Sequence, residues 1–487
     1  MYVGKKVTRV DAYDKVIGRT RYTDDLCDKS AYVARIVHST IANGRVLSID
    51  TSEAEKIPGV VKVFTCFDLK EKHYYPTAGH PWSTDPSHQD VADRLVLTER
   101  VRFYGDDIAA VVAEDEVAAA QALHALKIEY EESPFVLDVQ EAMKDGAPQL
   151  HEAYPNNILK HTTIRKGNYE EAIKEPGLIK VEGWYSTPTV QHCHIENFIC
   201  YAEMEGDRIK IVSSTQIPHI VRRVVGQALG IDWGKIRIIK PYIGGGFGNK
   251  QDILYEPLCA WLCTQLNGHL IKLDVPREET FVSTRVRHAI QSHIISWVRP
   301  DGTFAARKLE AFSDQGAYAS HGHSICAKGV GAFPQLYPCD NVEADGYTVF
   351  TNKSVAGAMR GYGIPQAMWA VESHTEEVAA RLGMDPIELP EYWIANDFIT
   401  FRFFYAGGAK EHMVNLTKHE ELTADGKTLL EFRHHAYGDP ENKSLYGYVS
   451  FPLKEVFNEV TDSVQLHIKY KGFDEEKNID ITYRPRK

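Results

Sequence analysis

Apolar residues recur with two different periods along the first 145 residues, which predicts a mixture of strands and helices. Residues 108–113 (IAAVVA) form a continuous apolar run and residues 127–132 (KIEYEE) alternate, so we expect both to be strands. Residues 114–126 between them are alanine-rich at helical spacing, and their acidic start favours the positive end of a helix dipole. Further strands are expected over 62–67 and 94–105. We interpret residues 1–145 as an α/β domain.

The pattern continues over residues 150–395 with a strand at 208–218, a helix at 219–231, a strand at 235–243 and a helix at 254–266. Gly230 is expected to close the first of these helices. Cys259 and Cys263 lie four apart in the second helix, which predicts two small core residues. We interpret residues 150–395 as a second domain.

The last segment, residues 396–487, changes character to short alternating runs. Val464, Leu466, Ile468 and Tyr470 would share one face of a strand, and an acidic turn precedes the next strand. This pattern predicts a small antiparallel β unit. The fold class predicted for the whole chain is α+β.

Composition places the chain among ordinary soluble globular proteins of about three domains. Its 487 residues are 43% hydrophobic and carry a net charge of -12, which argues against nucleic-acid binding. The start of the chain lacks the apolar core of a signal peptide, and no apolar run is long enough to cross a membrane. The eight cysteines form no C-x-x-C pair, which argues against a zinc site or an iron–sulfur cluster on this chain. We expect a cytoplasmic protein.

Residues 240–252 (KPYIGGGFGNKQD) are the most unusual stretch, because four glycines lie within residues 244–248. The spacing matches neither the dinucleotide fingerprint G-x-G-x-x-G nor the phosphate loop G-x-x-x-x-G-K-[ST]. Two interpretations remain open: a tight turn, or a close approach of the backbone to a ligand.

Three other stretches carry polar or aromatic groups that core packing does not explain. Gln216 lies between a strand and a helix, where its amide would contact a ligand or cap the helix. His321 and His323 would point the same way on a strand, as metal ligands do, although no carboxylate or thiol pattern accompanies them. Arg360 lies among glycines and would bind an anion or remain a solvated turn residue. Phe247, inside the glycine stretch, would wall a pocket or anchor the loop in the core.

In this order and spacing the stretches resemble the molybdenum hydroxylases, that is, the xanthine dehydrogenase and aldehyde oxidase family. The resemblance rests on VDAYDKVIGRTRYTDDL, YGDDIAAVVAEDEVAAAQALHALKIEYEESP, TPTVQHCHIE, SSTQIPHIVRRVVGQALGI, GGGFGNKQD, GAYASHGHS and AMRGYGIPQ. It covers about residues 1–395. It implies an α/β hammerhead domain followed by the first molybdopterin-binding domain.

The resemblance also implies roles for individual residues at the cofactor. Gln216 matches the glutamine that hydrogen-bonds an oxo ligand of molybdenum. Gly246, Phe247 and Gly248 match the loop whose backbone approaches the cofactor, and Arg360 matches an arginine beside it. No residue is implied as a direct metal ligand.

Three further residues are implied at the substrate. Tyr362 would help to wall the substrate pocket, and Lys328 stands where relatives carry an arginine. Gln251 occupies the position where purine-oxidising members often carry a substrate-binding glutamate, and a neutral amide cannot replace a carboxylate in substrate protonation.

The reaction implied is hydroxylation of an electron-poor carbon of an N-heterocycle or an aldehyde, with oxygen from water. The resemblance implies molybdopterin, or its cytosine dinucleotide form, with molybdenum, and partner subunits that carry FAD and iron–sulfur centres. The family's second half, which supplies the catalytic glutamate base, has no match here, so a truncated subunit that is inactive alone is expected. A subunit completed by another polypeptide is a further possibility.

The tail does not resemble that missing half, but weakly resembles the C-terminal domain of NigD-like proteins. The alternative function is therefore a non-catalytic binding or assembly protein whose C-terminal β unit is an interaction module. Truncation would also leave an exposed apolar face where the second half belongs.

Overall fold

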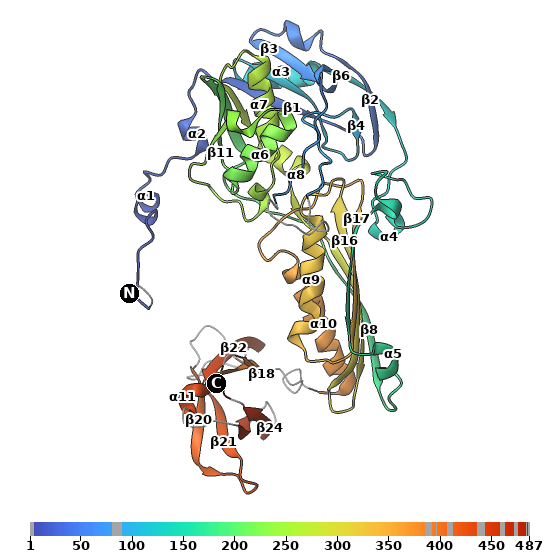
Figure 1. Cartoon of the computed structure of the whole chain (residues 1–487), viewed down its shortest axis with the longest axis vertical. Helices are drawn as coiled ribbons and strands as arrows, with labels where there is room; N and C mark the ends of the chain where they lie inside the picture. The colour runs from blue at the N-terminus through green and yellow to red at the C-terminus, as the bar shows by residue number, and fades with distance from the viewer. Residues whose placement is uncertain are drawn as a thin grey trace.

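The structure is a computed structural model that describes residues 4–79, 90–384, 392–395, 397–406, 413–435, 444–457, 463–471, 476–483 and 485. Figure 1 shows an upper α/β region, a long sheet backed by two helices below it, and a separate β region formed by the tail. Two short helices, α1 (Ala12–Val16) and α2 (Thr23–Leu26), precede the first sheet.

The central sheet of the upper region has seven strands in the order β12-β11-β10-β13-β1-β5-β3. Strands β1 and β13 pair in parallel, with Tyr32 opposite Ile271, and this pair unites strands from the first and second segments of the chain in one sheet. The strands are β1 (Tyr32–His38), β3 (Val60–Thr65), β5 (Asp107–Ala113), β10 (Ile199–Glu205), β11 (Arg208–Ser213), β12 (Ile236–Ile239) and β13 (Ile271–Asp274).

Three helices, α3 (Glu116–Ala125), α6 (Pro218–Leu229) and α7 (Glu256–Gln265), pack against this sheet. The carboxylate of Asp115 caps α3 by accepting from the N–H groups of Val117 and Ala118. Gly230 ends α6 at φ 65°, in the left-handed region that favours glycine. Cys259 and Cys263 are fully buried on α7, so the prediction of core cysteines is confirmed.

A smaller sheet, β4-β2-β6, lies beside the first and contains β2 (Gly44–Asp50), β4 (Arg100–Val101) and β6 (Lys127–Glu132). The strand predicted over residues 94–105 is wrong for most of its length, because only the two residues of β4 are in a strand. Val96, Leu97 and Phe103 are buried outside a sheet, and Arg94 and Arg102 take part in a polar network.

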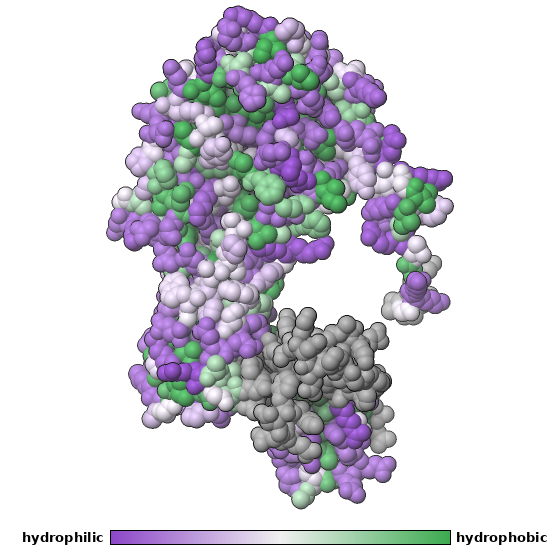
Figure 2. All heavy atoms as spheres, turned by 180° about the vertical axis from the view of Figure 1, so that it is seen from behind, coloured by the Kyte–Doolittle hydropathy of each residue, from purple (hydrophilic) through white to green (hydrophobic). Residues whose placement is uncertain are grey.

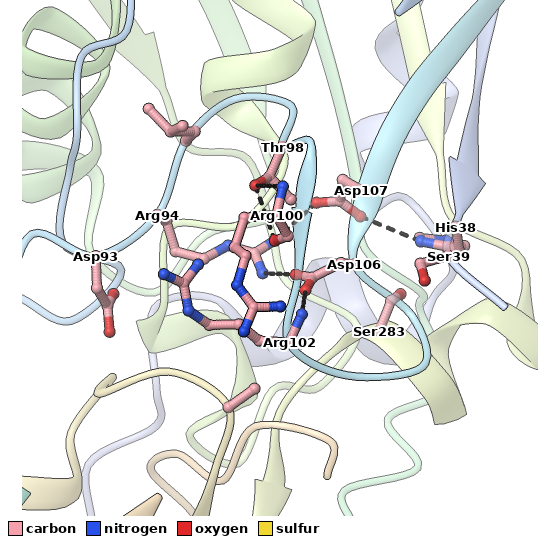
Figure 3. Close-up of polar contacts among 12 residues, drawn as sticks. His38, Ser39, Asp93, Arg94, Thr98, Arg100, Arg102, Asp106, Asp107 and Ser283 are labelled. Carbon is pink, nitrogen blue, oxygen red and sulfur yellow. Dashed lines mark hydrogen bonds and ion pairs between the residues drawn. The ribbon is translucent and has the colours of Figure 1, made fainter. Parts of the chain in front are cut away.

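That network is buried where the first segment meets the second (Figure 3). The guanidinium of Arg94, 5% exposed, donates to Asp106 at 3.2 Å and to Asp107 at 2.8 Å. His38 lies between Asp107, 3.1 Å from Nδ1, and Glu279 of helix α8 (Arg277–Ser283), 3.4 Å from Nε2. Burial lowers the pKa of His38, but its bonds to the two carboxylates outweigh this and raise the pKa to about 9.

The second sheet has the order β7-β17-β16-β15-β8. Alternate residues of β15 are buried beneath helices α9 (Gly322–Leu336) and α10 (Ile364–Leu382), which lie along one face of the sheet (Figure 1). The strands are β7 (Ile158–Lys166), β8 (Ile179–Thr187), β15 (Ile290–Val298), β16 (Phe304–Gly316) and β17 (Val342–Phe350). The short elements around it are β9 (Val190–Gln191), β14 (Val286–Arg287), α4 (Val139–Ala142) and α5 (Tyr169–Ala172).

The tail forms two sheets, β18-β19-β22 and β20-β21-β23-β24. All the strand pairs in the tail are antiparallel except β21 with β23, which is parallel. Leu466 and Ile468 are fully buried in a core whose members all lie between residues 399 and 483, as the alternation predicted. The elements are β18 (Tyr392–Ala395), β19 (Phe398–Ala406), β20 (Met413–Leu422), β21 (Thr428–His435), β22 (Ser444–Pro452), α11 (Leu453–Val456), β23 (Val464–Lys471) and β24 (Glu476–Tyr483).

Among the described residues, no helix has both the length and the apolar character needed to cross a membrane. Seen from behind, the upper region presents hydrophobic residues interspersed with hydrophilic ones (Figure 2).

Candidate functional site

The glycine loop, residues 240–248, follows β12 and ends in a 3-10 turn at Asn249–Gln251. A Cβ atom at Gly246 would lie 2.4 Å from Oε1 of Gln216. A Cβ at Gly248, whose φ is 114°, would lie 2.4 Å from the carbonyl oxygen of Ala358. The glycines are therefore required first by close contacts within the protein itself.

A second loop, residues 355–363, leads into α10 and lies against the glycine loop. The N–H of Arg360 donates to the carbonyl of Phe247 at 2.8 Å, and the guanidinium lies 5.5 Å from the centre of the Phe247 ring. Phe247 is 44% exposed, so it does not anchor the loop in the core. Phe247 and Tyr362 both have positive φ, 53° and 51°, which is strained for a bulky side chain and is most often found at functional sites.

The contact between the two loops leaves several hydrogen-bond donors without an acceptor. Oε1 of Gln216 accepts from the N–H of Gly248 at 3.1 Å, which leaves Nε2 of Gln216 to donate. Across the described residues, neither this Nε2 nor the N–H groups of Gly246 and Phe247 have a protein acceptor. Gly246 is buried, and a buried backbone N–H group is rarely left unpaired. The arrangement therefore suits a group that presents acceptor oxygens.

Below the loop, two charged groups are buried. Lys250 donates to Oε2 of Glu196 at 2.7 Å, and the same oxygen accepts from the N–H of Gly244 at 2.9 Å. Burial lowers the pKa of the Lys250 ammonium, and Glu196 opposes this shift. The sequence analysis did not single out either residue.

A second buried pair lies on the other side of the turn. Nε of Arg285 donates to Asp252 at 2.5 Å, and both side chains are fully buried. His321 connects this pair to the second loop, with Nε2 3.4 Å from Asp252 and Nδ1 2.9 Å from the Tyr362 hydroxyl. Burial raises the pKa of Tyr362. The Tyr362 hydroxyl therefore faces the protein interior.

The placement of the two histidines on a strand is wrong. His321 is the N-cap of α9 and His323 lies in its first turn. Residues two apart on a helix point to different sides, so the two rings do not converge. Within the described ranges, no three or more His, Cys, Asp or Glu side chains form a group that could hold a metal ion.

The two other predicted substrate residues differ in position. Gln251 lies in the turn beside the loop, and its N–H donates to Gly248 at 2.9 Å. Lys328 is exposed on α9, two turns beyond His321, and in the described part of the chain no hydrogen bond or ion pair joins it to either loop. The structure thus brings Gln216, Gly246, Phe247, Gly248, Gln251, Arg360 and Tyr362 together, and leaves Lys328 apart.

A cavity of about 350 Å³ lies elsewhere, between residues 68–73 and helices α6 and α7. It contains none of the predicted site residues. Its lining includes Leu69, Glu71, His73, Leu229, Ile231 and Trp261. By contrast, the two loops present their side chains on an open surface, because both Phe247 and Arg360 are exposed.

Comparison with known families identifies the domains to which these loops belong. Residues 150–393 match the molybdopterin cofactor-binding domain, and residues 17–134 match the a/b hammerhead domain of aldehyde oxidase and xanthine dehydrogenase. The chain belongs to the xanthine dehydrogenase and aldehyde oxidase family. Residues 370–483 match the NigD-like C-terminal beta sandwich domain, so the tail is similar to a different family from the rest of the chain.

Individual relatives support the assignment. The putative xanthine dehydrogenase molybdenum-binding subunit of Escherichia coli is 46% identical over 382 residues, which are 78% of this chain and 50% of that protein. The nicotinate dehydrogenase large molybdopterin subunit of Eubacterium barkeri is 32% identical over 80% of this chain and 88% of its own length. The aldehyde oxidoreductase structure from Desulfovibrio gigas matches with a TM-score of 0.74 at 26% identity, covering 88% of this chain and 52% of that one.

The chain therefore spans about half the length of the xanthine dehydrogenase subunits it matches, but most of the length of the nicotinate dehydrogenase subunit. The family uses molybdenum and molybdopterin, and the predicted recognition, fold class and enzyme class are confirmed. The roles of the individual site residues stay predictions.

Proposed function

We propose that this chain supplies one side of the molybdopterin site of a hydroxylase, and that polypeptide outside these 487 residues supplies the other side. The observation that carries the proposal is the contact between the two loops. Within the described part of the chain, it leaves the N–H groups of Gly246 and Phe247, on the loop that contacts Arg360, and Nε2 of Gln216 without protein acceptors. Such a donor set fits an anionic, oxygen-rich group.

In this proposal each residue acts by binding or orienting. The N–H groups of Gly246 and Phe247 and Nε2 of Gln216 would hold the cofactor by donating hydrogen bonds to its oxygen atoms. Arg360 supplies positive charge, and Phe247 excludes water on the side it covers. When bound, the molybdenum–pterin group supplies the two-electron oxidation, with water as the source of oxygen.

The proposed substrate is an N-heterocycle or an aldehyde, with Gln251 and Tyr362 at its pocket. Relatives whose names specify xanthine and nicotinate support the first class, and one named as an aldehyde oxidoreductase supports the second. Gln251 would hydrogen-bond a neutral substrate rather than accept its proton. Lys328 is exposed on α9 apart from both loops, so it would contact only a substrate that extends beyond them.

The base would come from outside the chain, because the carboxylates that contact the loops are already engaged. Glu196 is paired with Lys250, and Asp252 is paired with Arg285. Ile195, Phe247 and Ile364 are exposed on the segments around the site, which supports a covering polypeptide. The relative named a large molybdopterin subunit has nearly the length that this chain matches, which supports a divided site.

We further propose partner chains that carry FAD and iron–sulfur centres, which would remove the electrons. The relatives named as a molybdenum-binding subunit and as the large chain of a carbon monoxide dehydrogenase support a multi-chain enzyme. The proposed cofactor is either molybdopterin itself or its cytosine dinucleotide form.

The test is co-expression, in a host that makes the cofactor, with the part of the E. coli relative that this chain does not match. Oxidation of xanthine, nicotinate and benzaldehyde is followed with a dye as electron acceptor. We expect turnover of at least one of these compounds, and loss of at least about 100-fold with Arg360→Met. Arg381→Met, at the exposed end of α10, is the matched control and should keep full activity. Equal activity of both variants would contradict the proposed role, and a complex that binds no molybdenum would favour a binding or assembly protein.

A further inference from the structure

One ion pair, between Lys250 and Glu196, connects the turn after the glycine loop to the first of its four glycines, Gly244. On one side, Glu196 and Gly244 exchange two hydrogen bonds: N–H of Glu196 to the carbonyl of Gly244 at 3.1 Å, and N–H of Gly244 to Oε2 of Glu196 at 2.9 Å. On the other side, the ammonium of Lys250 donates to the same Oε2 at 2.7 Å. One carboxylate therefore contacts both sides of the glycine segment 244–248.

Lys250 also fixes the position of Gln216. The carbonyl of Lys250 accepts from the N–H of Gln216 at 2.8 Å, and Oε1 of Gln216 accepts from the N–H of Gly248 at 3.1 Å. A shift of Lys250 would therefore move the amide side chain as well as the loop.

Because Lys250 is buried, the ion pair and the conformation of the loop depend on each other. The side chain of Lys250 is 0% exposed and that of Glu196 is 14% exposed, so the Lys250 ammonium cannot reach water without a movement of the loop. A buried charge that loses its partner is strongly unfavourable, whereas the intact pair costs little. The conformation of the loop and the ion pair are therefore coupled.

We propose that Lys250 and Glu196 are positioning residues that hold residues 244–248 in the conformation that, among the described residues, leaves the N–H groups of Gly246 and Phe247 without a protein acceptor. Nothing in the family assignment requires this role. The identity of the bound group rests on the proposed function, but the position of the loop does not.

The test compares Lys250→Met and Glu196→Gln with Lys272→Met in the full chain. Lys272 of β13 forms an ion pair of the same length, 2.7 Å to Asp24, and its side chain is 21% exposed. Amide hydrogen exchange is measured for peptides covering residues 240–252 and, as an internal reference, for α7. Molybdenum per chain is measured on the same preparations, co-expressed as described above.

We expect Lys250→Met to accelerate exchange over residues 243–249 by about tenfold or more, with α7 unchanged, and to lower the molybdenum content. Glu196→Gln should give a smaller change in the same direction, because an amide keeps an acceptor for Gly244, and it decides the question if Lys250→Met fails to fold. Lys272→Met should change neither quantity.

Exchange that is unaltered over the loop, or accelerated equally in α7, would overturn the proposal. If the wild-type complex carries no molybdenum while loop exchange still accelerates in the variants, the proposed function fails and the positioning role stands. If the wild type carries molybdenum and loop exchange does not change, the positioning role fails and the proposed function stands.

Discussion

Arg94 and Arg360 lie in two polar regions of the same body but in opposite settings. At the junction between the two segments, the Arg94 guanidinium lies between two carboxylates and 4.6 Å from the Tyr318 ring, out of contact with water (Figure 3). At the paired loops, Arg360 is exposed and lies over Phe247. At the junction Arg94 is paired with Asp106 and Asp107, whereas the loops keep donors that have no acceptor among the residues the structure describes.

The difference distinguishes residues that stabilise the fold, at the junction, from residues that are available to bind another molecule, at the loops. At the junction, removing one charge leaves its partners buried and uncompensated, so the effect should appear in stability. At the loops, strain at Phe247 and Tyr362 and exposed side chains indicate that the surface is completed by something else. Substitutions at the loops should therefore change the binding of the cofactor more than the free energy of unfolding.

The largest effect on stability is expected from Arg94→Met. It leaves Asp106 and Asp107 buried without their cation, and should lower the free energy of unfolding of the body by about 3–5 kcal/mol. Arg45→Met is the matched control, because Arg45 is 59% exposed and 3.6 Å from Glu99, and should cost less than about 1 kcal/mol. Urea unfolding measures both. Similar losses would contradict the contrast between buried and exposed charges.

The next effect is a pH dependence caused by His38. Its pKa is raised from 6.5 to about 9 in the folded state, so its contribution is fully present below pH 6.5 and is lost as the pH rises through 9. The loss should approach about 3 kcal/mol. Unfolding of the wild type and of His38→Gln is compared from pH 6 to pH 10. A wild-type profile as flat as that of the variant would refute the assignment.

A smaller effect is expected from Gly248→Ala. The new Cβ would meet the carbonyl of Ala358 at a φ of 114°, which should cost about 1–3 kcal/mol and separate the two loops. Gly331→Ala is the control, because a Cβ there meets open space within α9, and it should be neutral or stabilising by up to about 1 kcal/mol. Denaturant unfolding distinguishes the two variants, and equal losses would argue against close contact of the loops.

The smallest effect on stability is expected from Phe247→Ala. Phe247 is 44% exposed and lies outside the core, so its removal should change the free energy of unfolding by less than about 0.5 kcal/mol while lowering the molybdenum content of the complex. Calorimetry and elemental mass spectrometry on one preparation check both statements. A large loss of stability would place Phe247 in the core instead.

The hydrophobic pattern correctly predicted elements that are buried on one face, or along one continuous apolar stretch. Strand β5 and helices α3 and α6 were found where the pattern placed them, as was the buried face of Leu466 and Ile468. The stretch at 94–105 failed because a run of apolar residues does not show whether its backbone pairs in a sheet. The prediction for the histidines failed because β16 ends at Gly316 and α9 begins at Gly322, so His321 precedes the helix and His323 lies in its first turn.

The resemblance to the family supplied the candidate site, and the structure brought most of its residues together. Glu196 and Lys250 were missed because a charged residue predicts a solvated position, and their burial depends on a pairing across 54 residues of sequence. The one available signal was Lys250 itself, a charge placed directly after a glycine-rich loop.

The most direct test of the central claim is molybdenum and pterin per chain, measured with and without the part of the E. coli relative that this chain does not match. Both preparations come from a host that makes the cofactor. A site supplied from two sides predicts well under one molybdenum per chain alone and close to one in the complex. Equal content in both preparations, whether near zero or near one, would contradict a site divided between this chain and polypeptide outside it.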